Sequence, residues 1–157
     1  MKNTLLLITL LLSFITYSQN KPTYPEAKKG FKRVDIMLPK IENEENYKVE
    51  VRFGIKHTMV ECAKGDFSLG RNNLTEKYGI PNSSRFPYYV VEDVNGDISV
   101  GMPSGCESTT KIEKTILSTE EVIFRYQSYF PVPFYIPGYC TLEYRVWSTT
   151  DTYNTLK

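Results

Sequence analysis

The chain has 157 residues, a length that fits one folded domain plus a targeting segment. Its 19 basic and 18 acidic residues nearly balance, so it lacks the basic excess that binding to nucleic acid or to an anionic membrane surface requires. It has a single histidine, no cysteine pair with zinc-finger spacing and no glycine-rich phosphate loop. These absences argue against a metal site and against a bound cofactor.

The N-terminal segment has the pattern of a signal peptide. Lys2 supplies a positive charge, and residues 5–15 are almost wholly apolar but too few to span a bilayer. Polar and small residues follow, with cleavage expected near Ser18 or Gln19. We therefore expect a signal peptide over residues 1–19 and an exported domain over residues 20–157. A membrane anchor is the alternative interpretation of this segment.

Period-two alternation predicts the first strands. Residues 34–38 alternate and end at Pro39, and residues 47–53 alternate apolar with charged side chains. A further strand is predicted over residues 58–62. His57 adjoins it and is interpreted as a residue on a strand face, not a catalytic one.

The middle of the chain mixes loop and strand signals. Residues 65–87 show no strand pattern and predict a long loop, whereas residues 88–94 predict a strand. Asn95-Gly96 follows that strand directly and predicts a hairpin that returns through residues 98–100. The run 93–97 resembles a calcium-binding loop, but its glycine is misplaced and the closing glutamate is missing, so we interpret it as a turn.

Three more strands are predicted toward the C-terminus. Residues 112–117 and 122–126 form two of them, separated by a polar run at 118–121 that is interpreted as a short capped turn. The stretch 131–137 contains three prolines, and residues 141–147 alternate cleanly as the last strand. Because short strands dominate and no long amphipathic helix is predicted, the expected fold is all-β: an antiparallel β-sandwich or partly open barrel with long functional loops.

Several groups of residues occur in an order that matches a known family. They are Tyr24-Pro25, Ala27, Lys29-Gly30, Lys32-Arg33, Lys48-Val49-Glu50, Tyr88-Tyr89-Val90, Arg125-Tyr126, Ser128, Pro131 and Tyr144-Arg145-Val146-Trp147. This ordered set resembles the ecotin family, which are periplasmic inhibitors of serine proteases. The resemblance covers nearly all of the chain after the signal peptide. It implies a periplasmic protein that inhibits proteases and is not itself an enzyme.

The resemblance also implies a reactive loop. The family disulfide would join Cys62 and Cys106, and the loop immediately before Cys106 would bind a protease as a substrate does. It contains Val100, Gly101, Met102, Pro103 and Ser104. Counting from Cys106 places Pro103 at the primary specificity position, whereas side-chain shape favours Met102. The third cysteine, Cys140, is interpreted either as a buried inert thiol or as an intermolecular link.

A second protease contact and a dimer are further implications of the resemblance. The C-terminal strand would form a two-fold homodimer, so that each trypsin-, chymotrypsin- or elastase-like protease is held by one subunit's loop and by a distal patch of the other subunit. Arg125, Gln127, Tyr129, Phe130 and the loop 78–86 would form that patch.

Two other functions compete with this interpretation. An exported β-sandwich could serve as a binding or adhesion module without inhibitory activity, in which case an aromatic platform on a sheet face is expected. A hydrolase is disfavoured, because the chain has one histidine and no G-x-S-x-G motif.

Overall fold

The computed structural model describes residues 22–70, 72–80, 86–94 and 96–148, so the predicted signal peptide lies outside the described residues. The described part contains nine strands and one short 3-10 turn. In chain order they are β1 (Phe31–Ile36), η2 (Glu44–Asn46), β2 (Tyr47–Val60), β3 (Lys64–Phe67), β4 (Leu74–Tyr78), β5 (Pro87–Val91), β6 (Ile98–Gly101), β7 (Lys111–Arg125), β8 (Val132–Pro137) and β9 (Thr141–Ser148). No helix in this part is long and apolar enough to cross a membrane.

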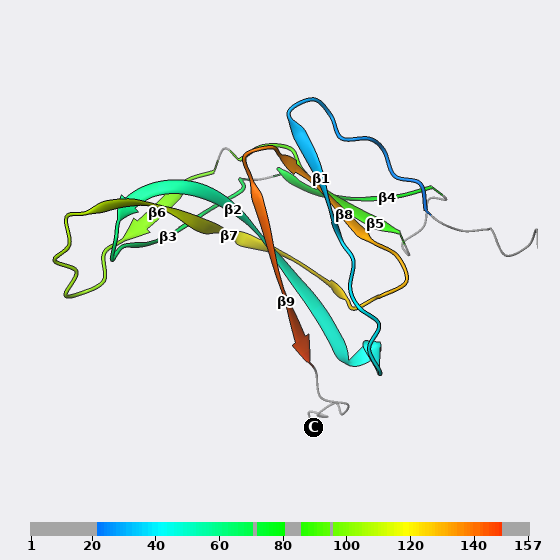
Figure 1. Ribbon diagram of the computed structural model, residues 1–157. Helices are drawn as coiled ribbons and strands as arrows, with labels where there is room; N and C mark the ends of the chain where they lie inside the picture. The colour runs from blue at the N-terminus through cyan, green and yellow to red at the C-terminus, as the bar shows by residue number, and fades with distance from the viewer. Residues whose placement is uncertain (1–21, 71, 81–85, 95, 149–157) are drawn as a thin grey trace, which may run out of the picture.

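The strands form two sheets, which confirms the all-β prediction (Figure 1). One sheet has the order β1-β8-β5-β4, and the other has the order β6-β3-β7-β2-β9. Both sheets are mixed, not purely antiparallel, because β5 runs parallel to β8 and β3 runs parallel to β7. Neither sheet closes into a barrel.

The centre of the larger sheet is a long antiparallel ribbon of β2 and β7. Their pairing runs from Lys48 opposite Arg125 to Val60 opposite Lys111, with a bulge between Arg52 and Gly54. Each was predicted as two shorter strands, and that prediction is wrong. His57 does lie on β2, as expected.

Two other predictions also need correction, and one strand was not predicted. Residues 65–87 were expected to be a loop, yet β3 and β4 lie within or across this segment. The proline-rich stretch forms β8, a buried inner strand. No hairpin forms around Gly96, because β5 pairs with β4 and β8, whereas β6 pairs with β3 in the other sheet. The asparagine of that predicted turn lies outside the described residues.

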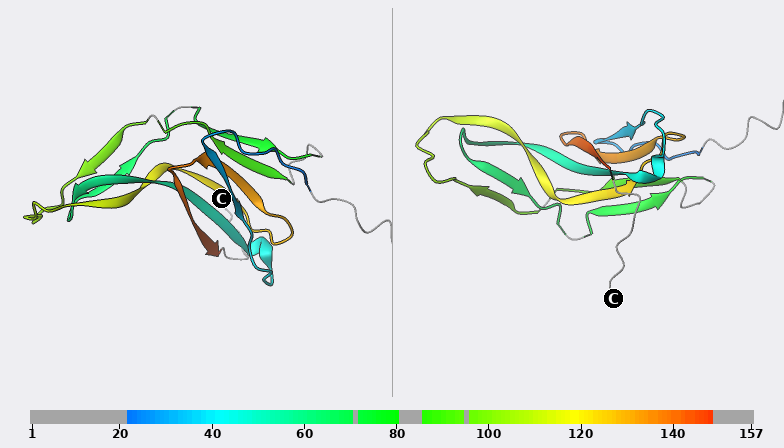
Figure 2. Two further views of the ribbon diagram at one scale, coloured as in Figure 1. Left: turned by 45° about the horizontal axis from the view of Figure 1, so that its top comes forward. Right: turned by 90° about the horizontal axis from the view of Figure 1, so that it is seen from below.

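Aromatic and branched side chains from both sheets form one core. Phe134 is fully buried at its centre, with its ring 5.0 Å from that of Tyr89 and 6.2 Å from that of Phe53. The alternation of β2 places Val49, Val51 and Phe53 on this inner face, where none is exposed. The two-sheet core therefore fixes one half of the β2–β7 ribbon. The other half extends beyond the smaller sheet together with β3 and β6 (Figure 2).

Candidate functional site

The segment predicted as the reactive loop follows an edge strand. β6 is the outermost strand of its sheet and pairs only with β3 within the described chain, where Val100 lies opposite Gly65 and Gly101 opposite Lys64. Residues 98–105 are all exposed, and Met102 exposes 59% of its surface. An extended segment with a free edge can accept main-chain hydrogen bonds from another protein.

A turn and a disulfide close the base of this loop. The amide of Cys106 donates to the carbonyl of Pro103 at 3.1 Å, and Gly105 has a φ of +82°, a conformation that glycine adopts without strain. Cys106 is bonded to Cys62, as the resemblance implied, with the two Cα atoms 5.7 Å apart. The loop is thus tied at both ends, by strand pairing at Gly101 and by a covalent bond at Cys106.

Lys114 on β7 supports the other side of the disulfide. Its ammonium group donates to the carbonyl of Glu61 and, at 3.1 Å, to the carbonyl of Ala63, so it bridges the residues on either side of Cys62. The amide of Glu61 also donates to the carbonyl of Thr110 at 2.8 Å. These contacts hold the 61–63 turn against β7, and the turn holds Cys106 through the disulfide.

The two predicted halves of the distal patch lie next to each other. The ring of Phe130 meets that of Phe86 edge to face, with centroids 5.1 Å apart. Tyr129 exposes 71% of its surface, Arg125 is exposed at the end of β7, and Gln127 is half-buried. Residues 81–85 of the predicted loop lie outside the described part of the chain.

The N-terminal segment joins these halves, which the sequence did not reveal. Thr23 and Ile80 exchange two backbone hydrogen bonds of 2.9 Å, and the hydroxyl of Tyr24 donates to the carbonyl of Pro131 at 3.4 Å. Glu44 adds support by accepting bonds from the amide and hydroxyl of Ser128, at 3.3 and 2.5 Å. These hydrogen bonds therefore restrain the backbone that carries the exposed side chains of the predicted patch.

The segments predicted as the reactive loop and the distal patch lie at opposite ends of the molecule (Figure 1). β7 connects them, with Lys111 near the loop and Arg125 at the patch, and its 15 residues span about 45 Å at the usual rise of an extended chain. The two predicted contact segments are therefore separated by roughly the length of β7.

The C-terminal strand β9 is the other edge of the larger sheet. It pairs with β2 along its whole length, from Gly54 opposite Thr141 to Tyr47 opposite Ser148. Residues 143–148 are all exposed, including Tyr144, Val146 and Trp147. An exposed edge strand of eight residues with apolar side chains is a surface on which another strand can pair.

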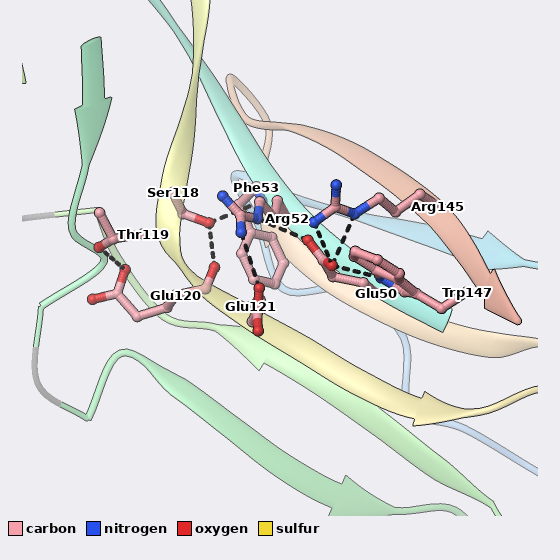
Figure 3. A network of polar contacts seen from close by, with 9 residues as sticks. All are labelled: Glu50, Arg52, Phe53, Ser118, Thr119, Glu120, Glu121, Arg145 and Trp147. Atoms are coloured by element: carbon pink, nitrogen blue, oxygen red, sulfur yellow. Dashed lines mark hydrogen bonds and ion pairs between the residues drawn. The ribbon is translucent and has the colours of Figure 1, made fainter. Parts of the chain in front are cut away.

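A buried carboxylate lies beside β9 on the outer face of the sheet (Figure 3). Glu50 is 4% exposed and accepts hydrogen bonds from Arg145, Trp147 and Arg52. Burial by itself would raise its pKa, but the bonds from Arg145, Trp147 and Arg52 outweigh burial, so the pKa lies below the usual value. The period of β2 predicts that Glu50 and Arg52 share a face, but their partners on β9 lie almost a hundred positions away.

Cys140 is fully buried and is not part of a disulfide. Burial raises the pKa of its thiol to about 11. Its surroundings match the interpretation as an inert thiol in the core. Among the described residues no cluster of three or more His, Cys, Asp or Glu side chains is arranged to bind a metal.

Together, the fold and the site define a class: an all-β protein that presents an exposed loop after an edge strand, fixed at its base by a disulfide. A family model for ecotin matches residues 20–149. The chain is 33% identical to an ecotin of Pseudomonas fluorescens over 94% of this chain and 89% of the relative. It is 35% identical to an ecotin of Serratia proteamaculans, over 82% and 72%, and 33% identical to a putative ecotin-like protein of Methylobacillus flagellatus, over 87% and 80%. The chain belongs to the ecotin family of serine protease inhibitors.

Proposed function

We propose that this protein inhibits trypsin-fold serine endopeptidases by presenting residues 100–104 to the active site as a substrate would. One observation carries the proposal: Met102 is exposed directly after the edge strand β6, in a loop whose base is fixed by the Cys62–Cys106 disulfide. The free edge of β6 supplies main-chain groups that can pair with the protease as an added strand. The Met102 side chain, which is unbranched and polarisable, would enter the primary specificity pocket.

Inhibition in place of ordinary turnover would follow from the restraints on the loop. Gly101 is held by pairing with Lys64, and Cys106 is held by the disulfide and by its bond to Pro103. A segment that is already ordered loses little conformational entropy when it binds, which favours tight association. The same restraints would keep the residues around the scissile bond in place, so that hydrolysis is slow.

The register of the loop can be tested by changing the charge of single residues. We would titrate trypsin, chymotrypsin and elastase with the oxidised protein and with Met102→Asp, using Thr109→Asp as the control for an added charge in the same connection. Met102→Arg and Pro103→Arg would then be compared on trypsin, which accepts basic side chains. The proposal predicts that Met102→Asp weakens inhibition of chymotrypsin by at least about a hundredfold, the size expected for an unpaired charge in an apolar pocket. It also predicts that only Met102→Arg increases the preference for trypsin.

Other results would contradict parts of this proposal. If Pro103→Arg alone redirected the preference, Pro103 would be the primary specificity residue. If wild-type protein inhibited none of the three proteases, the inhibitory proposal would fail for these enzymes. Wild-type inhibition that Met102→Asp and Pro103→Arg both leave unchanged would exclude the loop as the main contact.

We further propose that the protein acts in the periplasm as a homodimer joined through β9. The exposed apolar side chains on this free edge, among them Tyr144 and Val146, support such pairing. In that dimer a protease would contact the reactive loop of one subunit and the distal patch of the other, formed by Arg125, Gln127, Tyr129 and Phe130. Sedimentation of wild type and of Val146→Lys tests the dimer: dissociation of the variant alone supports it, and a wild-type monomer at all concentrations refutes it.

A further inference from the structure

Side-chain burial contributes little to holding the second half of β9. Its backbone pairs with β2 on one side, but residues 143–148 are exposed, and Leu142 before them is only half-buried. A strand held mainly by backbone pairing at a sheet edge frays readily, because few apolar contacts oppose its opening. Some other interaction must fix where this part of β9 lies.

Besides the backbone pairing, Glu50 supplies the main polar contact of side chains between β9 and the rest of the sheet. One of its carboxylate oxygens accepts hydrogen bonds from Arg145 Nε at 2.8 Å and from Trp147 Nε1 at 2.7 Å, and lies 2.7 Å from a terminal guanidinium nitrogen of Arg145. Its other oxygen accepts from Arg52 Nε at 3.0 Å. Arg145 and Trp147 both lie in the C-terminal half of β9. Glu50 pairs directly opposite Arg145 in the strand register (Figure 3).

We infer that Glu50 is the residue that positions the C-terminal half of β9, and with it the surface that a second subunit would meet. The bonds to Glu50 fix two side chains that alternate with Tyr144 and Val146 on the strand. The bonds to Glu50 therefore restrain the twist of the C-terminal half of β9 and its position relative to β2. The consequence for assembly rests on the proposed dimer, whereas the positioning of β9 does not.

Two features of this cluster make the effect local. The guanidinium of Arg145 lies 4.3 Å from the ring centroid of Trp147, so these two residues also hold each other. Both are largely exposed, so they can be hydrated when Glu50 no longer accepts their bonds. Loss of the carboxylate charge is thus expected to loosen β9 without unfolding the core, which lies on the opposite face of β2.

The experiment compares Glu50→Gln with Glu121→Gln as the matched control. Glu121 carries the same charge on the same outer face and bonds to Arg52 at 3.0 Å, but it has no bond to β9. Hydrogen exchange of the β9 amides at a concentration low enough to keep the protein monomeric measures positioning directly. The fluorescence of Trp147, the only tryptophan of the chain, reports the loss of its bond to Glu50.

We expect Glu50→Gln to speed exchange in β9 and to raise the dimer dissociation constant, each by roughly tenfold, as the loss of one charge-assisted interaction would. The Trp147 emission should shift in Glu50→Gln and stay unchanged in Glu121→Gln. Arg145→Met should reproduce the exchange result from the exposed side of the cluster, in a variant that leaves β2 untouched.

The inference would be overturned if the β9 amides of both Glu50→Gln and Arg145→Met exchanged at the same rate as those of the wild type. An equal effect of Glu121→Gln would also overturn it, because general loss of negative charge on the face would then explain the result. If the wild type proved monomeric, only the proposed dimer would fail, and the exchange of β9 would still decide the role of Glu50.

Discussion

Burial and hydrogen bonding act on the Glu50 carboxylate in opposite directions. Because the bonds prevail, its pKa in the folded protein is below its usual value, and the stabilisation that it contributes is present above the unfolded-state pKa. That stabilisation is lost as the pH falls through the folded-state pKa. The bonds to Arg145 and Trp147 therefore weaken only in acid, well below neutral pH.

This sign leads to a pH prediction for Trp147. In wild type, its fluorescence should change in a titration whose midpoint lies below the ordinary pKa of a glutamate. At the pH of this midpoint, the near-UV circular dichroism of the core aromatic residues should still be that of the folded protein. Glu50→Gln should show no such step, and a step that persists in this variant would assign the titration to another carboxylate.

Lys114 carries a second prediction at the scale of single residues. Lys114→Met removes the donor for the carbonyls of Glu61 and Ala63, so the turn around Cys62 should open more often. We expect dithiothreitol to reduce the Cys62–Cys106 bond at least about tenfold faster, since a hydrogen bond from a charged group contributes about 1.5–3 kcal/mol and about 1.4 kcal/mol corresponds to a factor of ten. Lys111→Met, on the exposed end of the same strand, is the control. Equal reduction rates in all three proteins would contradict the role of Lys114.

For the buried free cysteine Cys140 we predict an absence of reaction in the folded protein. Since it is fully buried and its pKa is raised to about 11, it should not react with a thiol reagent such as DTNB at pH 8 in the native protein. One equivalent should react after unfolding in urea without reductant. Rapid reaction of the native protein would instead support the interpretation of Cys140 as an accessible thiol able to link two molecules.

Among the elements, the bulge between β2 and β7 explains why two strands were each predicted as a pair. On β7, residues 118–120 lie opposite the single residue Phe53, because Arg52 pairs with Glu121 and Gly54 with Leu117. The hydroxyl of Ser118 accepts from the amide of Phe53 at 3.1 Å and donates to the carbonyl of Glu120 at 2.6 Å (Figure 3). The polar run that suggested a capped turn in fact satisfies the backbone of a bulge.

Gly54 allows this bulge to be tested. A Cβ atom there would lie 2.3 Å from Thr141 Oγ1 and 2.8 Å from Thr115 Cγ2, so side chains of both neighbouring strands would have to move. Gly54→Ala should lower the free energy of unfolding by about 1–3 kcal/mol, the usual cost of overpacking. Gly101→Ala is the control for stability, because a Cβ there would have no heavy atom of the described chain within 4 Å apart from those of its adjacent residues. Urea denaturation of the two variants measures both effects, and equal stability would contradict the tight packing at Gly54.

Local pattern predicted some elements well and others poorly, for physical reasons. β9 and the first half of β2 alternate apolar and charged residues, and both strands lie close to where the sequence placed them. β8 could not be recognised because all its side chains are buried, so alternation is absent, and Pro133 and Pro137 argued against a strand. The residues of the proposed site were likewise only partly predictable from the sequence. The resemblance supplied the cysteine pair that the structure confirms, whereas the contacts of Lys114, Tyr24 and Glu50 depend on long-range pairing.

At the scale of the whole molecule, the distance between the proposed reactive loop and the proposed distal patch bears on whether one subunit or two would supply the contacts to a protease. If both contacts come from one subunit, a loop mutation and a patch mutation each damage every site, whichever subunits are mixed. If they come from two subunits, a mixed dimer of one loop variant and one patch variant contains one site with both contacts intact. The length of β7 favours the second arrangement.

Mixed dimers therefore provide a direct prediction. Met102→Asp and a variant with Arg125→Ala and Phe130→Ala should each inhibit weakly alone. Mixed and allowed to exchange subunits, they should recover tight inhibition at close to one protease per heterodimer, because the two contacts reinforce each other when they bind together. Active-site titration measures the recovered fraction. No recovery in verified heterodimers would place both contacts on one subunit, or would remove the patch from the binding surface.

The Cys62–Cys106 bond has one more consequence, which concerns the protein after a protease has cut it. A break between Met102 and Pro103 would leave Cys62 on one fragment and Cys106 on the other, so the two pieces would remain a single covalent molecule. The new carboxyl end would stay paired through β6 to β3, and the new amino end would lie only a few residues from the sulfur bridge. A cut inhibitor would therefore keep both ends at a high local concentration and remain a competitor for the same active site.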